Sequence, residues 1–157
     1  MKIYFANGLF SQADQNFNAT LAQKIRSINS TIDLYLPQEN QTINDKNLYA
    51  DSKMIAKGDT EKLLESDLMV AILDGVNLDA GVAAEIGVAY ANSIPIIGFY
   101  SDTRQLGATN SQKIKALQDI AENQFFYINL YVIGLIKLNG KIVNNEHDLL
   151  SAIKVKI

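Results

Sequence analysis

The segment from Ala80 to Ser101 constrains the fold of this chain most, because it carries one charged residue, Glu85. The residues around Glu85 are small or apolar, which predicts a helix that lies in the protein core. A carboxylate there is disfavoured unless it has a partner or a use. Glu85 therefore has two interpretations. It is either tied to a loop or to the helix dipole at a helix start, or it is kept for chemistry.

Two apolar runs, at residues 67–73 and 94–99, lack the alternation of a half-exposed strand. Such runs are typical of strands buried on both faces of a parallel sheet. Hydrophobic residues at helical spacing predict a first helix over 14–30. The full set of expected strands is 2–6, 32–36, 67–73, 94–99 and 141–143. The expected helices are 14–30, 45–65, the Glu85 helix, 111–122, 125–138 and 148–155.

This alternation of strands and helices predicts one doubly wound α/β domain over residues 1–157, of the flavodoxin-like or Rossmann-like kind. We expect five parallel strands in the order 2-1-3-4-5. Ligands of such sheets bind at the carboxyl ends of the strands, where the strand order reverses. Asn7 and Gly8 should therefore face the segment 79–85. The residues expected around this crevice are acids and amides: Asn7, Gln38, Asn40, Gln41, Asp59, Asp74, Asp79 and Glu85.

Composition excludes several classes of function. The net charge of −3 and the lack of a basic block argue against nucleic-acid binding. Without cysteine there is no disulfide, thiolate catalysis or Cys-ligated metal, and the one histidine, His147, lies in a polar segment. The N-terminus does not resemble a signal peptide, and the longest strongly apolar uncharged run, 123–136, is shorter than the roughly 20 residues that span a bilayer. We expect a cytoplasmic protein with no membrane partner.

The crevice lacks the usual means of binding phosphate. Neither GxGxxG nor GxxxxGK[ST] follows the first strand, and no arginine lies between Arg26 and Arg104. Acids and amides suit a neutral ligand with many donors, such as a nucleoside. A carboxylate such as Glu85 can attack the anomeric carbon of a sugar while a second carboxyl protonates the leaving group. Asp59 is the candidate for this second role, although it could instead only cap a helix that begins after Gly58.

Several short motifs together resemble the nucleoside 2-deoxyribosyltransferase family. Residues 3–10 resemble the opening strand and loop, in which Tyr4 matches the tyrosine that orients the catalytic glutamate. The segment 37–41 resembles the loop whose glutamine, here Gln41, contacts the base. Gly58-Asp59 matches the aspartate that protonates the base. The segment 79–87 resembles the core signature.

In that core signature, the resemblance implies that Asp79 binds the sugar hydroxyls and that Glu85 is the nucleophile. It also implies that Asn129 reaches into the site of a neighbouring subunit, in a dimer, tetramer or hexamer. We expect Gly8 and Phe10 to bind substrate as part of the opening loop. Leu9 departs from the tryptophan of some members, and the chain after Gly140 does not follow the family pattern.

The resemblance implies transfer of 2-deoxyribose between the bases of 2′-deoxynucleosides, without metal or organic cofactor. Two alternatives stay open. One is a 2′-deoxynucleoside 5′-monophosphate N-glycosidase, whose phosphate-binding Ser and Arg are missing here at Asp79 and after the first strand. The other is a non-catalytic nucleoside-binding module. The apolar segment 124–136 likewise predicts either a core helix or a subunit interface.

Overall fold

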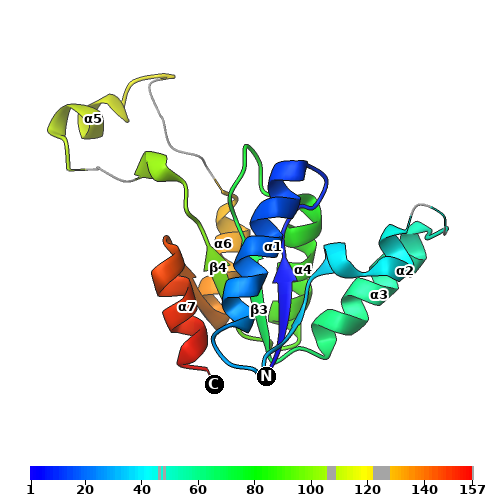
Figure 1. Cartoon of the computed structure of the whole chain (residues 1–157). Helices are drawn as coiled ribbons and strands as arrows, with labels where there is room; N and C mark the ends of the chain where they lie inside the picture. Colours follow the sequence, from blue (N-terminus) through cyan, green and yellow to red (C-terminus); the bar gives the residue numbers. More distant parts are fainter. Residues whose placement is uncertain (46, 48, 106–108, 122–127, 157) are drawn as a thin grey trace.

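The computed structural model describes residues 1–45, 47, 49–105, 109–121 and 128–156. Its centre is a parallel five-stranded sheet in the order β2-β1-β3-β4-β5, which confirms the predicted fold and strand order (Figure 1). The strands are β1 Lys2–Ala6, β2 Asp33–Tyr35, β3 Leu68–Ile72, β4 Ile96–Phe99 and β5 Gly140–Val143.

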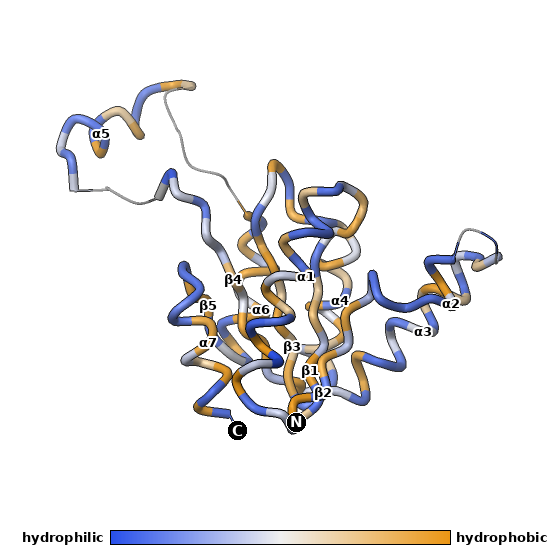
Figure 2. The backbone as a smooth tube through the Cα atoms, viewed as in Figure 1, coloured by the Kyte–Doolittle hydropathy of each residue, from blue (hydrophilic) through white to orange (hydrophobic). Residues whose placement is uncertain are grey.

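Helices cover both faces of this sheet. On one face lie α1 (Gln12–Arg26) and α7 (Glu146–Lys154), and on the other lie α4 (Ala80–Ala91) and α6 (Leu130–Asn139). The helices α2 (Gln41–Asn44) and α3 (Ser52–Leu64) extend to the side of the sheet beyond β2 (Figure 1). Figure 2 shows that apolar residues are concentrated in the central strands. The remaining helices are η1 (Pro37–Glu39), η2 (Thr103–Gln105) and α5 (Ser111–Ala116).

Alternation along β1 assigns its side chains to two separate cores. Ile3 and Phe5 pack on the side of α1 and α7, whereas Tyr4 and Ala6 pack on the side of α4 and α6. All four residues are fully buried. Tyr4 therefore lies inside the same core layer as the helix that carries Glu85.

The prediction of one helix over 45–65 was wrong. The structure has the short helix α2, whose first residue is Gln41, and then α3, which begins at Ser52. Asp51 caps α3 by accepting a hydrogen bond from the Met54 amide at 2.8 Å, and this cap fixes where the helix begins. Leu48, which the prediction placed on the inner stripe, lies outside the described residues.

Gly58 and Asp59 do not interrupt α3 but lie within it, so Asp59 is not a helix cap. A Cβ at Gly58 would lie 3.3 Å from Ile43 Cδ1, so the glycine lets α2 approach α3 closely. This packing explains a glycine in the interior of a helix. As a result, Asp59 is held in position by an uninterrupted helix.

Other element ends differ from the predictions. The first helix begins at Gln12 because Ser11 caps it in a reciprocal pair with Asp14. The helix predicted over 111–122 is α5, which ends at Ala116, and the one predicted over 125–138 is α6, which begins at Leu130. Residues 122 and 125–127 lie outside the described part. No described helix has both the length and the apolar character needed to cross a bilayer.

Candidate active site

The side chain of Glu85 is held by the sheet beneath it. The Tyr4 hydroxyl donates a hydrogen bond of 2.6 Å to Glu85 Oε1. Because Tyr4 is fully buried in β1, its ring has a fixed position, and it fixes one oxygen of the carboxylate. Burial, together with the charge of Glu85 and the bond to it, raises the pKa of the Tyr4 hydroxyl above its ordinary value. Tyr4 therefore remains a hydrogen-bond donor at any physiological pH.

Burial also raises the pKa of Glu85, from 4.5 to about 7. The bond from Tyr4 lowers this pKa, while the negative charges of Asp59 and Asp79 raise it further. A carboxylate whose pKa lies near 7 is a stronger nucleophile than an ordinary glutamate. It is still ionised in a large fraction of the molecules at neutral pH. The environment of Glu85 thus favours the chemical interpretation over a purely structural one.

Asp79 lies at the N-terminus of the same helix. It caps α4, since its Oδ1 accepts a hydrogen bond of 3.0 Å from the Val82 amide. A Cβ at Gly8 would lie 3.9 Å from Asp79 Oδ2, so this second oxygen lies on the side of the β1 loop. The cap orients the carboxylate, and the first turn of α4 therefore presents a fixed acceptor to the space above β1.

Asp59 belongs to a second group of polar side chains. The Tyr35 hydroxyl donates to Asp59 Oδ1 at 2.9 Å, and Asn40 Nδ2 donates to the Tyr35 hydroxyl at 3.0 Å. Burial raises the pKa of Asp59 above its ordinary value, and the bond from Tyr35 opposes this increase. The rings of Tyr4 and Tyr35 stack with centroids 5.5 Å apart, which joins the two groups.

One hollow of about 300 Å³ brings the three carboxylates together. Its volume lies at the small end of the range for small-molecule sites. Its lining comprises Asn7, Gly8, Leu9, Phe10, Pro37, Ile43, Asn44, Ile55, Asp59, Asp79, Gly81, Val82 and Glu85. The predicted meeting of Asn7 and Gly8 with the 79–85 segment is therefore observed, at the carboxyl ends of β1 and β3.

The buried side chain of Asn18 holds the β1 loop against this hollow. Its Nδ2 donates to the Gly8 carbonyl and to Gln38 Oε1, both at 3.0 Å, and its Oδ1 accepts a 2.7 Å bond from Asn7. Asn18 is 1% exposed. Sequence reasoning missed this residue, because an asparagine on a helix gives no signal that it faces a loop.

Two predicted substrate residues do not line this hollow. Gln41 lies instead at a second hollow, of about 360 Å³, between β2 and α3. Asn129 is exposed and caps α6, with its side chain accepting from the Tyr131 amide at 2.9 Å. Phe10 does line the site, but 85% of its surface is exposed.

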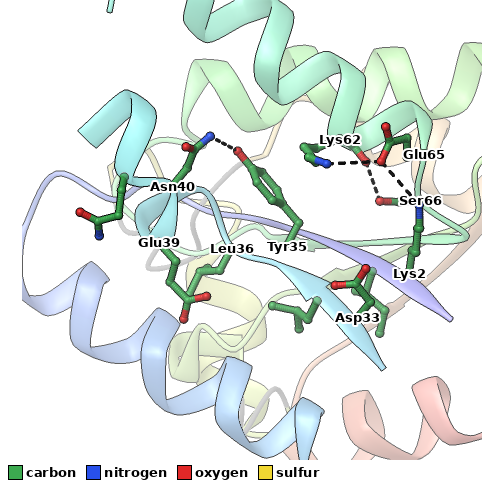
Figure 3. A pocket seen from close by; sticks show the side chains of 12 residues that line it. Lys2, Asp33, Tyr35, Leu36, Glu39, Asn40, Lys62, Glu65 and Ser66 are labelled. Carbon is green, nitrogen blue, oxygen red and sulfur yellow. Dashed lines mark hydrogen bonds and ion pairs between the residues drawn. The ribbon is translucent and has the colours of Figure 1, made fainter. Parts of the chain in front are cut away.

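Three further residues expected at the crevice also have other partners. Asp74 accepts hydrogen bonds from the Ser101 amide and hydroxyl, and Gln38 contacts Asn18. Asn40 lies at the second hollow, where Figure 3 shows it pointing at the Tyr35 hydroxyl. Tyr35 thus lines the second hollow and contacts Asp59 of the first through its hydroxyl, a role that neither composition nor spacing indicated.

Within the described residues, no group of three His, Asp or Glu side chains stands close enough to hold a metal ion. The three carboxylates at the hollow come instead from two helices: Asp79 and Glu85 belong to α4 and its cap, and Asp59 belongs to α3. This arrangement can supply a nucleophile and a proton donor to one small molecule.

Comparison with known proteins assigns the chain to a family. The sequence profile of the nucleoside 2-deoxyribosyltransferase family matches residues 3–144. The chain belongs to this family. A search of curated proteins finds no match. Among solved structures, a conserved protein from Enterococcus faecalis V583 is similar at 63% identity, with a TM-score of 0.94 and coverage of 99% of this chain and 98% of the other.

More distant neighbours share the fold of this family member. A 2-deoxyribosyltransferase from Bacillus psychrosaccharolyticus is 20% identical, with a TM-score of 0.64 and coverage of 96% and 90% of the two chains. A CMP N-glycosidase from Clostridium botulinum is 16% identical, with a TM-score of 0.52 and full coverage of both chains. At these identities the likeness concerns the fold alone.

Proposed function

We propose that the protein transfers 2-deoxyribose between the nucleobases of 2′-deoxynucleosides, by a retaining double displacement through a deoxyribosyl ester of Glu85. The observation that carries this proposal is the Glu85 carboxylate, which Tyr4 holds at 2.6 Å beside a hollow that Asp59 and Asp79 also line. Membership of the deoxyribosyltransferase family supports the same reaction class.

In the first half-reaction, Glu85 attacks C1′ of the sugar and forms a C1′–O bond. The C1′–N bond to the base breaks, and its electron pair takes the proton of Asp59, so that a neutral base leaves and Asp59 becomes a carboxylate. In the second half-reaction, a different base attacks C1′ from the other side of the ester. Asp59 takes its proton back, and Glu85 returns as a carboxylate. Two inversions retain the configuration at C1′.

The charges at the hollow favour a nucleoside over a nucleotide. Three carboxylates line it, and none of its described lining residues is a lysine or an arginine. Asp79 would accept a hydrogen bond from the sugar hydroxyl, a contact that suits a carboxylate because it only accepts. A 5′-phosphate at the same place would meet repulsion without a cation to offset it. The N-glycosidase acting on monophosphates is therefore the weaker candidate.

A base-exchange assay tests the proposal directly. The protein incubated with deoxyinosine and adenine should yield deoxyadenosine and hypoxanthine, whereas Glu85→Gln should yield neither. With a donor but no acceptor, mass spectrometry of acid-quenched peptides should find a deoxyribosyl adduct on the peptide with Glu85. Exchange near the wild-type rate in Glu85→Gln would refute the mechanism. Release of free deoxyribose with no exchange would favour a hydrolase.

The proposal extends to a homo-oligomer in which Asn129 completes the site of a neighbouring subunit. Asn129 is exposed and lies away from the lining of its own chain's hollow. The first turn of α6 beside it presents Leu130 and Tyr131, which are 82% and 75% exposed. An apolar surface next to a polar residue without a place in its own site suits a subunit interface.

Complementation between inactive variants tests this arrangement. Refolding Asn129→Ala together with Glu85→Gln should restore activity, because a mixed oligomer pairs an intact Glu85 with an intact Asn129. Each variant refolded alone is the control. A protein that sediments as a monomer at micromolar concentration while fully active would contradict the proposal, as would a mixture that stays inactive.

A further inference from the structure

The proposed acid Asp59 has a neighbour, Tyr35, for which no sequence motif indicated a role. Tyr35 ends β2, and its register partner on the adjacent strand is Tyr4. Its hydroxyl lies 2.9 Å from Asp59 Oδ1 and 3.0 Å from Asn40 Nδ2. One tyrosine thus contacts the proposed acid with its hydroxyl and stacks its ring on the tyrosine that holds the proposed nucleophile.

The direction of these hydrogen bonds follows from Asn40. The Oδ1 atom of Asn40 caps α2 by accepting from the Thr42 amide at 3.1 Å, so its Nδ2 is the atom that faces Tyr35. An amide nitrogen only donates. Tyr35 therefore accepts a hydrogen bond from Asn40 and must direct its single proton to Asp59. Figure 3 shows the first of these two hydrogen bonds, between Asn40 and Tyr35.

This chain of donors fixes which oxygen of Asp59 can carry a proton. Oδ1 accepts from Tyr35, so the proton of a neutral Asp59 resides on Oδ2. Burial raises the pKa of Tyr35 to about 12, which keeps its hydroxyl protonated throughout the physiological range. The donor that occupies Oδ1 is therefore always present.

We propose that Tyr35, oriented by Asn40, is the positioning residue of the proposed acid: it occupies Oδ1 of Asp59 and leaves the transferable proton on Oδ2. This inference rests on the function proposed above. When Asp59 gives its Oδ2 proton to the leaving base, it becomes a carboxylate, and the Tyr35 bond becomes charge-assisted and stronger. Tyr35 thus stabilises the product side of proton transfer and makes Asp59 a stronger acid than burial alone would allow.

Two variants remove this donor in different ways. Tyr35→Phe deletes the hydroxyl and keeps the ring that stacks on Tyr4. Asn40→Asp keeps a cap for α2 but cannot donate, so Tyr35 turns its proton from Asp59 to the new carboxylate. Matched controls are Tyr49→Phe, at an exposed tyrosine, and Asn145→Asp, at the asparagine that caps α7.

The first readout compares two deoxyribosyl donor substrates, which differ in whether the leaving base must be protonated by an acid. Deoxyguanosine needs a proton on its leaving base, whereas 7-methyl-2′-deoxyguanosine carries a cationic base that leaves without one. Both variants should lose about tenfold or more in kcat/KM for deoxyguanosine. They should lose little for the methylated donor, and the controls should match the wild type. Equal losses for the two donors would mean a merely structural role and would overturn the inference.

The second readout does not depend on activity. In protein with ¹³C-labelled aspartate, carboxyl NMR titration should give Asp59 a higher pKa in Tyr35→Phe and in Asn40→Asp than in the wild type, because the bond from Tyr35 lowers this pKa. An unchanged pKa in both variants would overturn the inference. If the wild type cleaves no deoxynucleoside, the proposed function fails, and the titration still decides whether Tyr35 acts on Asp59.

Discussion

Replacement of Glu85 by glutamine should stabilise the protein, and the gain should depend on pH. Burial raises the pKa of Glu85 from 4.5 to about 7. One pKa unit corresponds to about 1.4 kcal/mol, so the folded protein holds the ionised side chain about 3 kcal/mol less favourably than the unfolded chain does. Glutamine keeps the shape and an oxygen that can accept the bond from Tyr4, but it has no charge to bury.

The sign follows from proton uptake. Between pH 4.5 and 7 the folded state holds a proton on Glu85 that the unfolded state has released, so the free energy of unfolding falls as the pH rises through this window. Below pH 4.5 both states are protonated and no penalty exists. Glu85→Gln should therefore exceed the wild type by about 3 kcal/mol at pH 8 and by less than about 1 kcal/mol at pH 5.

Urea unfolding at pH 5 and pH 8 measures this difference. Glu61→Gln, at a glutamate on the outside of α3, is the matched control and should change stability little at either pH. A gain for Glu85→Gln that is the same at both pH values would show that Glu85 is not held at a raised pKa. The activity of the wild type should rise with pH, whereas its free energy of unfolding falls. Its kcat/KM should rise with pH up to about 7, because only the ionised Glu85 is a nucleophile.

Three further variants test the surroundings of the nucleophile. Asp79 should repel a 5′-phosphate at a distance of 4 Å by about 4 kcal/mol, so kcat/KM for deoxyadenosine should exceed that for its monophosphate by about a thousandfold. Asp79→Ser should reduce this ratio, and comparable wild-type values for the two substrates would refute the nucleoside assignment. Gly81→Ala places a Cβ 2.9 Å from Asp79 Oδ1 and should lower kcat/KM, whereas Gly87→Ala, which meets nothing within 4 Å, should not; equal activity in the two would contradict the clash. Asn18→Leu leaves the polar groups of the β1 loop unpaired and should lower the free energy of unfolding by about 1–3 kcal/mol, measured by urea titration; unchanged stability would show that water replaces the amide.

The sheet was predictable because its signals are strong and local. Strands buried on both faces read as unbroken apolar runs, as at β3, and the helices between them impose parallel order. The boundary of α3 was not predictable, because Asp45 and Asp51 are both plausible caps in one polar stretch. Only packing against Ile43 decides that Gly58 belongs inside a helix.

The site shows the same division. The meeting of Asn7 and Gly8 with the segment 79–85 could be predicted from sequence, since β1 and α4 meet at the point where strand order reverses, whereas the place of Tyr4 was implied only by the resemblance to the family. The place of Tyr35 could not be predicted, because its contact with Asp59 depends on the register of β2 against β1 and on the path of α3. For Gln41, the match to the family motif did not indicate that this residue lines the second hollow and not the one with the three carboxylates.

The residues around the hollow differ in how far a substitution would disturb the protein. Tyr4, which holds Glu85, lies fully inside the hydrophobic interior, so a substitution that changes the size of this ring disturbs the core. Phe10 and Ile55 also line the hollow, but they are 85% and 39% exposed. The proposed reaction places the base at Asp59, one helical turn from Ile55, and the sugar at Glu85, which Tyr4 holds. Under that mechanism, redesign for a new nucleobase would begin at solvent-facing side chains, whereas acceptance of a new sugar would require rebuilding the interior.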